Sequence, residues 1–224
     1  MVLGLSSTTA FADGHAQDYT ESGYFIFNTL LFLIGGFLVM WMAAGFAMLE
    51  TGLVRSKNAS TQLIKNVALF SLASIAYFIV GFNLMYPGDG WIINGWMGGF
   101  SLTGLEPAGV SADGVDLTYA SVGSDFFFQL MFCAATASIV SGTVAERVKL
   151  WPFLIFTIVL TGIFYPISAS WQWGGGWLSE AGFSDFAGST LVHSTGGAAA
   201  LAGIMLLGSR YGRFDSKGEA KAIK

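Results

Sequence analysis

Apolar residues along the chain fall into five long stretches that polar connections separate. The stretches cover about residues 24–48, 63–85, 126–144, 150–171 and 188–207. Each is close to the roughly 20 residues that a helix needs to cross the apolar core of a bilayer. The pattern predicts an all-α integral membrane protein whose five-helix transmembrane bundle occupies residues 24–208.

The composition of the chain also indicates that much of its surface faces lipid. Hydrophobic residues make up 54% of the chain, charged residues only 11%, and the mean hydropathy is +0.63. A soluble domain carries about 25% charged residues, so this chain cannot cover a water-exposed surface of ordinary composition. Cys133 is the only cysteine, which excludes an intrachain disulfide and a cysteine zinc cluster. We predict the lipid bilayer as a partner, and neither nucleic acid nor a cofactor.

The basic residues are distributed unevenly among the connections. All ten Lys and Arg residues lie in three groups: Arg55, Lys57 and Lys65 between the first two stretches, Arg147 and Lys149 between the third and fourth, and five residues after the fifth. The N-terminal arm and the connections over residues 86–125 and 172–185 contain none. The positive-inside rule then predicts a multi-pass plasma (inner) membrane protein with its N-terminus outside and the basic segment 209–224 in the cytoplasm.

The N-terminal residues resemble the end of a leader. Ala10-Phe11-Ala12 before Asp13 fits a signal-peptide cleavage site, although the positive start of such a peptide is not present. We interpret residues 1–12 as a truncated signal peptide and residues 13–23 as an extracytoplasmic arm. A disordered arm with no cleavage is the alternative.

Small residues recur at helical spacing in two of the stretches. They are Ala134, Ser138 and Gly142 in the third, and Gly196 with Ala200 and Ala199 with Gly203 in the fifth. Small residues four apart allow close backbone contact between membrane helices. We therefore expect a compact bundle.

Three polar or aromatic positions are candidates for function. His193 lies inside the fifth stretch, about two turns from its outer end. An ionisable group at such a depth usually marks a functional site. The alternative is a structural histidine that bonds a neighbouring backbone carbonyl. Asp185 precedes that stretch, where capping of the helix is favoured over direct cation binding. Trp171, Trp173 and Trp177 surround Gly174-Gly175-Gly176, and an indole face there could attract a cation, although composition alone favours an interfacial tryptophan belt.

At these residues the sequence resembles the ammonium transporter family, which includes methylammonium permeases and Rhesus proteins. The motifs occur in the family's order, from Leu49-Glu50-Thr51-Gly52-Leu53-Val54-Arg55 through Phe128-Gln129, Phe132 and Ala145-Glu146-Arg147 to Trp173-Gly174-Gly175-Gly176 and Asp185-Phe186-Ala187-Gly188-Ser189-Thr190-Leu191-Val192-His193. The resemblance covers nearly all of the chain after Asp18. A tryptophan at position 173 favours the Amt branch.

The resemblance implies a role for each matching residue. Trp173 would line an outer recruitment site for ammonium, and Asp185 would support that site. Phe132 would be one of the phenyl rings that gate the pore, and His193 the first of two pore histidines. The implied substrates are ammonium or ammonia, with methylammonium as a candidate. The implied assembly is a homotrimer, and a cytoplasmic PII-type regulator is a candidate partner.

The resemblance also implies about eleven helices in two inverted repeats, with the pathway between them. The five predicted helices match the first repeat, so we interpret the chain as an N-terminal half or fragment of an ammonium transporter. A natural half-length protein is also conceivable on this sequence, and we predict no efficient transport by the isolated chain.

Three further functional classes fit the sequence less well. An ammonium sensor of the same fold is the second interpretation after transport. A purely structural bundle does not account for His193, Asp185 and Trp173 together. A membrane enzyme is not favoured, because His193 has no nucleophile or metal partner nearby in the sequence.

Overall fold

The computed structural model describes the backbone of residues 7–102, 110–111, 114–115 and 119–222, and the side chains of residues 22–102 and 119–222. The chain divides into two compact units. Unit 1 comprises Met1–Phe37 and Leu105–Gln129, and unit 2 comprises Leu38–Gly104 and Leu130–Lys224.

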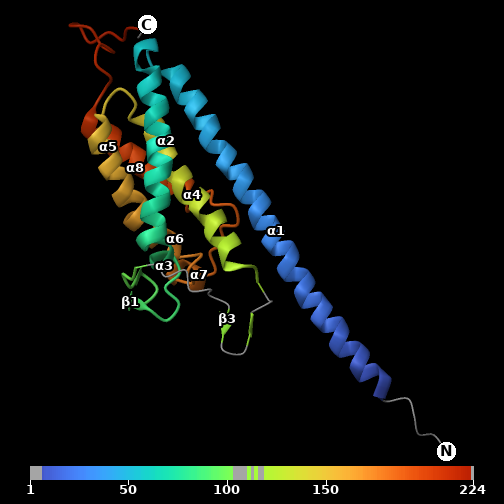
Figure 1. Ribbon diagram of the computed structural model, residues 1–224. Helices are drawn as coiled ribbons and strands as arrows, with labels where there is room; N and C mark the ends of the chain where they lie inside the picture. The colour runs from blue at the N-terminus through green and yellow to red at the C-terminus, as the bar shows by residue number, and fades with distance from the viewer. Residues whose placement is uncertain (1–6, 103–109, 112–113, 116–118, 223–224) are drawn as a thin grey trace, which may run out of the picture. The chain divides into compact units, whose positions relative to one another are not determined.

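The described chain is mostly helical (Figure 1). Its α-helices are α1 (Ser7–Leu53), α2 (Ala59–Ala76), α3 (Phe82–Met85), α4 (Val122–Thr143), α5 (Leu150–Val159), α6 (Tyr165–Ser170), α7 (Trp177–Glu180) and α8 (His193–Leu207). A 3-10 helix, η1 (Ser56–Asn58), precedes α2, and two π-helical segments, η2 (Tyr77–Gly81) and η3 (Leu160–Phe164), continue α2 and α5 without a break. Two short antiparallel hairpins pair β1 (Trp91–Ile93) with β2 (Met97–Gly98) and β3 (Val110–Ser111) with β4 (Gly114–Val115).

Four helical runs are long and apolar enough to cross a membrane. They are Ser22–Leu53, Ser56–Met85, Val122–Thr143 and Leu150–Ser170. The fifth apolar helix, α8, has 15 residues, fewer than the stretch 188–207 suggested. Residues 188–192 form a turn instead, because Gly188 adopts a positive φ of 79° that interrupts the helix. The predicted fold class is therefore confirmed, with a shorter fifth helix.

The N-terminal residues that the structure describes are helical. Helix α1 begins at Ser7 and includes residues 13–23, whose placement as an extracytoplasmic arm stays a prediction. Whether residues 1–12 are removed as a leader stays a prediction.

Unit 1 joins α1 to the first part of α4 through aromatic rings. Phe32 stacks on Phe128 with ring centroids 5.1 Å apart, and Phe37 packs against Phe127 at 5.2 Å. A side chain at Gly36 would place its Cβ 2.5 Å from the Phe127 ring, so only glycine lets this ring lie against the helix.

Unit 2 contains the main hydrophobic core. Leu69 of α2, Val140 of α4, Phe153 of α5 and Ala200 of α8 are all buried in one cluster. The α4–α8 contact uses one of the predicted small residues, because a Cβ on Gly196 would lie 3.0 Å from both the Ile139 side chain and the Thr136 carbonyl. On α4 the contact is made by Thr136 and Ile139, and the predicted small residue Gly142 faces Glu50 instead.

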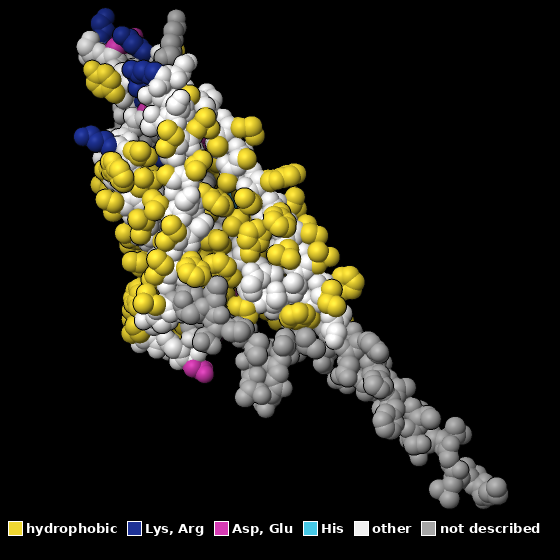
Figure 2. Space-filling model, in the orientation of Figure 1, with side chains coloured by type: hydrophobic (Ala, Val, Ile, Leu, Met, Phe, Trp, Pro, Cys, Tyr) yellow, Lys and Arg dark blue, Asp and Glu magenta, His cyan; other side chains and the backbone are white. Residues whose placement is uncertain are grey.

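Charge is segregated on the surface of unit 2. Figure 2 shows hydrophobic side chains along the flanks of the helices and Lys and Arg side chains gathered at the end where the C-terminus lies. A lipid-facing flank and a basic end agree with a membrane-spanning bundle. Which side of the membrane the basic end occupies stays a prediction.

Candidate functional site

Trp173 lies in a tight turn that glycines make possible. After α6 ends at Ser170, the chain turns through Trp173 to Gly176, and the backbone N–H of Trp173 donates to the Ala169 carbonyl at 2.9 Å. Gly174 packs against the Met85 carbonyl so closely that a side chain could not be accommodated. The glycines therefore bring this turn against the end of α3 and fix the direction of the tryptophan.

The Trp173 indole is held at two points. Its Nε1–H donates to the backbone carbonyl of Asp185 at 2.7 Å, and its ring packs against Phe132 of α4 with centroids 5.7 Å apart and planes inclined by 37°. Phe132 is only 8% exposed, whereas the indole is half-buried. The structure therefore brings together three of the four predicted site residues.

Asp185 organises the turn that leads into α8. One carboxylate oxygen accepts the backbone N–H groups of Gly188 and Ser189, and the other accepts those of Thr190 and Leu191, at 2.8 to 3.2 Å. Capping by Asp185 was predicted, but the capped groups precede α8 rather than belong to its first turn. Gly188 completes the arrangement, because a Cβ there would lie 3.2 Å from the Trp173 ring.

His193 is the first residue of α8. The prediction that it lies two turns inside the fifth helix was therefore wrong, for the reason given by the turn at Gly188. Its backbone N–H donates to the Gly188 carbonyl at 3.1 Å, which ties it to the turn that Asp185 holds. Its imidazole is exposed, and among the described side chains it makes no hydrogen bond or ion pair.

The arrangement offers aromatic faces and hydrogen-bonding groups beside an apolar interior. An indole face attracts a cation, whereas a buried phenyl ring behind it disfavours any ion that must keep its charge and water. Within the described part of the chain, no group of three His, Cys, Asp or Glu residues could hold a metal ion. The site thus combines an indole face, a buried phenyl ring and a carboxylate that is already bonded to backbone N–H groups.

A second polar cluster, inside the bundle, was missed in the sequence. Glu50 of α1 is 1% exposed, and one of its carboxylate oxygens accepts hydrogen bonds from Gln62, Asn66 and Ser141. Glu50 and Gln62 lie just beyond the ends of the predicted apolar stretches, where polar residues are expected to reach water, and only Asn66 lies inside one. The cluster links the end of α1 to α2 and α4.

Lys65 belongs to the same region. We predicted it among the loop cations, which was wrong: it lies in α2, is 5% exposed and donates to the Ser141 carbonyl at 2.8 Å. Its ammonium group also lies 4.8 Å from the centre of the Phe153 ring. A lysine within reach of the helix end can bury its stem and still find such partners.

Glu146 ties together the segments at the basic end. Its carboxylate accepts from the backbone N–H and Nε of Arg55 and lies 3.7 Å from Arg210, and its backbone adopts a positive φ of 59°. Burial alone would raise the pKa of this carboxyl, but hydrogen bonds from Asn58 and Arg55 and the charge of Arg55 outweigh it and lower the pKa. Glu146 is therefore ionised at neutral pH and holds the two arginines.

Comparison with known proteins places these features in a family context. The family model described as "Ammonium Transporter Family" matches residues 30–224. The ammonium transporter Amt2 of Archaeoglobus fulgidus is 42% identical over 233 residues, which cover 100% of this chain and 47% of that protein. The ammonium transporter of Bacillus subtilis is 34% identical over 82% of this chain and 44% of its own length.

Solved structures give the same result. The crystal structure of Candida albicans Mep2 matches with a TM-score of 0.68 and 29% identity, over 85% of this chain and 41% of that one. Saccharomyces cerevisiae Mep2 matches with a TM-score of 0.67 and 28% identity, over 82% of this chain and 40% of that one. The chain spans about half the length of the curated relatives it matches.

Proposed function

The chain belongs to the ammonium transporter family, and from that premise we propose that it supplies the N-terminal half of a pathway that takes up ammonium. The observation that carries the proposal is the contact of Trp173 with both Phe132 and the Asp185 carbonyl. This contact supports the proposal because it brings together, from distant parts of the sequence, the residues to which we assign recruitment and gating.

Recruitment of the cation is assigned to Trp173. A cation over an indole face gains about 0.5–2 kcal/mol, and the gain is larger where water is excluded. Because the indole is fixed by its hydrogen bond and by the Phe132 ring, little conformational entropy is lost when the cation binds.

Asp185 is assigned a supporting role. Both of its carboxylate oxygens already accept two backbone N–H groups each, which leaves little capacity for a direct bond to ammonium. The carboxylate instead fixes the turn through Gly188, and with it the carbonyl that orients Trp173 and the start of α8.

Passage is assigned to Phe132 and His193. An apolar constriction at Phe132 rejects hydrated metal cations, whereas ammonium can release a proton and pass as ammonia. The exposed His193 imidazole offers one donor and one acceptor nitrogen for ammonia or for the released proton.

Transport is favoured over the remaining functional classes. The relatives are named ammonium transporters, which supports a membrane transport protein rather than an enzyme and does not favour an ammonium sensor. The homotrimer, the PII-type regulator, methylammonium as a second substrate, the outside N-terminus and the status of a half or fragment remain parts of the proposal that rest on resemblance and charge distribution.

The test is uptake of labelled methylammonium and growth on low ammonium. The chain is expressed, by itself and with any coding sequence that follows Lys224, in cells that lack their own ammonium transporters. We expect Trp173→Ala to raise the half-saturating concentration by about 2- to 30-fold, the range that a lost cation–π contact gives. His193→Ala should lower the maximal rate.

Trp151→Ala is the matched control, because this tryptophan lies on α5 and is 74% exposed, away from the turn of Trp173. It should leave uptake unchanged. If a membrane-inserted wild type gives no uptake, or if Trp151→Ala and Trp173→Ala have the same effect, the proposal is wrong.

A further inference from the structure

Asp125 is a buried acid in the first turn of α4, within unit 1. Its side chain is only 7% exposed, and its Oδ1 atom has no hydrogen-bond partner among the described residues. Asp185 is similarly buried, but its two carboxylate oxygens receive four backbone N–H groups. Because a buried carboxylate oxygen without a donor is costly, Asp125 requires a partner that carries one.

Gln129 presents a second acceptor next to this acid. It follows Asp125 by one helical turn, is 6% exposed, and its side-chain amide lies beside the Asp125 carboxylate. Its Oε1 atom is also buried and unpartnered within the part of the chain that the structure describes. Two neighbouring oxygens, one from a carboxylate and one from an amide, therefore lack a donor.

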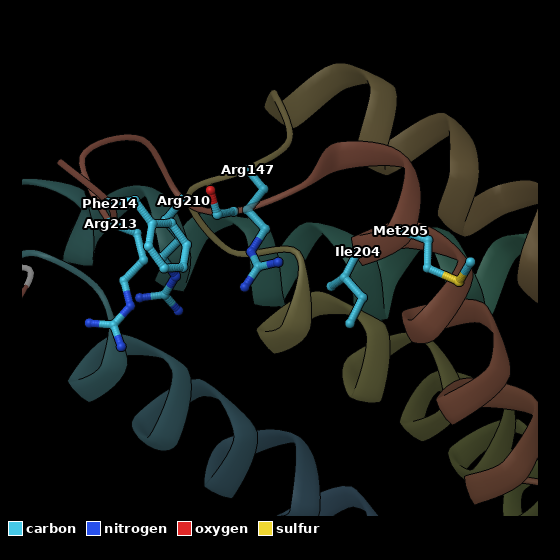
Figure 3. Close-up of a pocket in the computed structure, with 7 residues that line it drawn as sticks. Arg147, Ile204, Met205, Arg210, Arg213 and Phe214 are labelled. Atoms are coloured by element: carbon cyan, nitrogen blue, oxygen red, sulfur yellow. The ribbon is translucent and has the colours of Figure 1, made fainter. Parts of the chain in front are cut away.

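Unit 1 supplies no basic side chain to this acid, because all ten Lys and Arg residues lie in unit 2. Figure 3 shows three of them, Arg147, Arg210 and Arg213, around a pocket at the end of α8. Burial and the charge of Asp125 raise the pKa of the Tyr119 hydroxyl, so this neighbouring phenol stays neutral. The N-terminus of α4 gives only a partial positive charge. A cation from outside the chain would therefore complete the site.

The position of the two acceptors on α4 relates them to the pathway. The rotation of about 100° per residue places Asp125, Gln129 and Phe132 on one face of this helix. Phe132, to which we assign gating, follows Gln129 by three residues, or about 4.5 Å along the axis. A cation at Asp125 and Gln129 would thus lie ahead of the gate, toward the connection that the charge distribution predicts to be extracytoplasmic.

We propose that Asp125 Oδ1 and Gln129 Oε1 bind ammonium ahead of Phe132, at a site additional to the indole face of Trp173. The inference rests on the proposed uptake of ammonium. An N–H group of the cation forms a charge-assisted hydrogen bond to the carboxylate, and a second N–H group can donate to the amide oxygen. Ca²⁺ and Mg²⁺ take about six or more oxygen ligands, whereas no described group of three His, Cys, Asp or Glu residues could hold a metal ion.

The test is the midpoint of thermal unfolding of the purified chain, with any sequence that follows Lys224, in a Trp173→Ala background that removes the indole site. Ammonium chloride replaces sodium chloride at constant ionic strength. Because a ligand that binds only the folded state stabilises it, we expect the midpoint to rise with ammonium but not with potassium. Asp125→Asn should raise the apparent dissociation constant at least about 10-fold, and Gln129→Leu about 2- to 10-fold.

Asp89→Asn is the matched control, because it removes the same charge from an exposed position in a predicted outer connection. It should leave the ammonium effect unchanged. In sodium chloride alone, Asp125→Asn should be at least as stable as its parent, since it removes an unpaired buried charge.

Three results would overturn the site: an ammonium effect that survives Asp125→Asn, an equal effect of potassium, or a loss of stability of Asp125→Asn in sodium chloride. The uptake measurement tests the proposed function separately. A wild type that takes up methylammonium, together with an ammonium effect that Asp125→Asn does not change, would refute this site and leave the proposed function standing.

Discussion

Asp185 is a single buried carboxylate that receives four backbone N–H groups. Hydrogen bonds to a charged acceptor contribute about 1.5–3 kcal/mol each, and Asp185 is only 6% exposed. The turn from Gly188 to Leu191 precedes α8, and its carbonyls accept backbone N–H groups from Val192, His193 and Ser194. The backbone N–H groups of the turn itself, by contrast, donate to Asp185, so this side chain stabilises the shape of the turn.

We predict that Asp185→Asn lowers the free energy of unfolding by about 3 kcal/mol. The asparagine amide keeps one acceptor oxygen, but its NH2 group replaces the other and cannot accept a hydrogen bond. Two hydrogen bonds are therefore lost, and the NH2 group faces the two backbone N–H donors that made them. The measurement is the midpoint of unfolding of the purified chain in a mild detergent.

Asp215→Asn serves as the control for this change. Asp215 also accepts two backbone N–H groups, from Lys217 and Glu219, but these bonds are exposed to solvent. Its effect should stay within about 0.5 kcal/mol. Equal shifts for the two variants would mean that the buried carboxylate does not stabilise the turn.

Trp173 and Asp185 could be selected from the sequence because each carries an unusual chemistry for its place in the chain. A tryptophan beside three glycines and an acid before an apolar helix could both be recognised, and Asp185 does bond backbone N–H groups. The predicted position of His193 was wrong because the small and apolar residues 188–192 were counted as part of the fifth helix, whereas the positive φ of Gly188 delays the start of that helix. Average hydropathy does not distinguish a turn of such residues from the first turn of a helix.

Glu50 and Lys65 were missed for a different reason. Both lie near the ends of apolar stretches, where a charged residue is expected to reach water. Their burial depends on partners from other helices, such as Ser141 of α4. One sequence contains no direct information on which helices become neighbours.

At the level of elements, α8 packs against α4 through a glycine. Gly196 faces Ile139 and Thr136 of α4, whereas Gly197, the next residue, has no atom within 4 Å of its Cβ position among the described neighbours. Helical rotation of about 100° per residue separates the two faces. Substitutions at Gly196 test the packing of α8 against α4, whereas substitutions at Gly197 test only the helix propensity of the new residue.

We predict that Gly196→Leu destabilises the chain by about 1–3 kcal/mol or more, because the new side chain would force α8 away from α4. Gly197→Leu should be neutral or slightly stabilising, since leucine favours helix over glycine by somewhat under 1 kcal/mol. Thermal unfolding of both variants in the same detergent measures the difference. A larger loss for Gly197→Leu would show that α8 presents its other face to α4.

At the scale of the whole molecule, the number and order of apolar helices followed from the sequence, because spans of this length in lipid must satisfy their backbone internally. The division of the second and fourth spans by η2 and η3 did not, since π-helical segments have no hydrophobic signature. All ten basic residues lie in unit 2. Four of them lie between helices, namely Arg55 and Lys57 between α1 and α2, and Arg147 and Lys149 between α4 and α5. This asymmetry makes orientation the most direct property to measure.

We predict that a cysteine replacing Glu180 reacts with a membrane-impermeant maleimide on intact cells, whereas one replacing Lys57 reacts only after permeabilisation. Both positions are exposed, and the native Cys133 is fully buried, so background labelling should be low. Lys217→Cys should behave like Lys57→Cys, because the positive-inside rule places both on the cytoplasmic side. Labelling of Lys57→Cys and Lys217→Cys on intact cells would reverse the orientation, and it would place the Trp173 turn on the cytoplasmic side, where it could not recruit external ammonium.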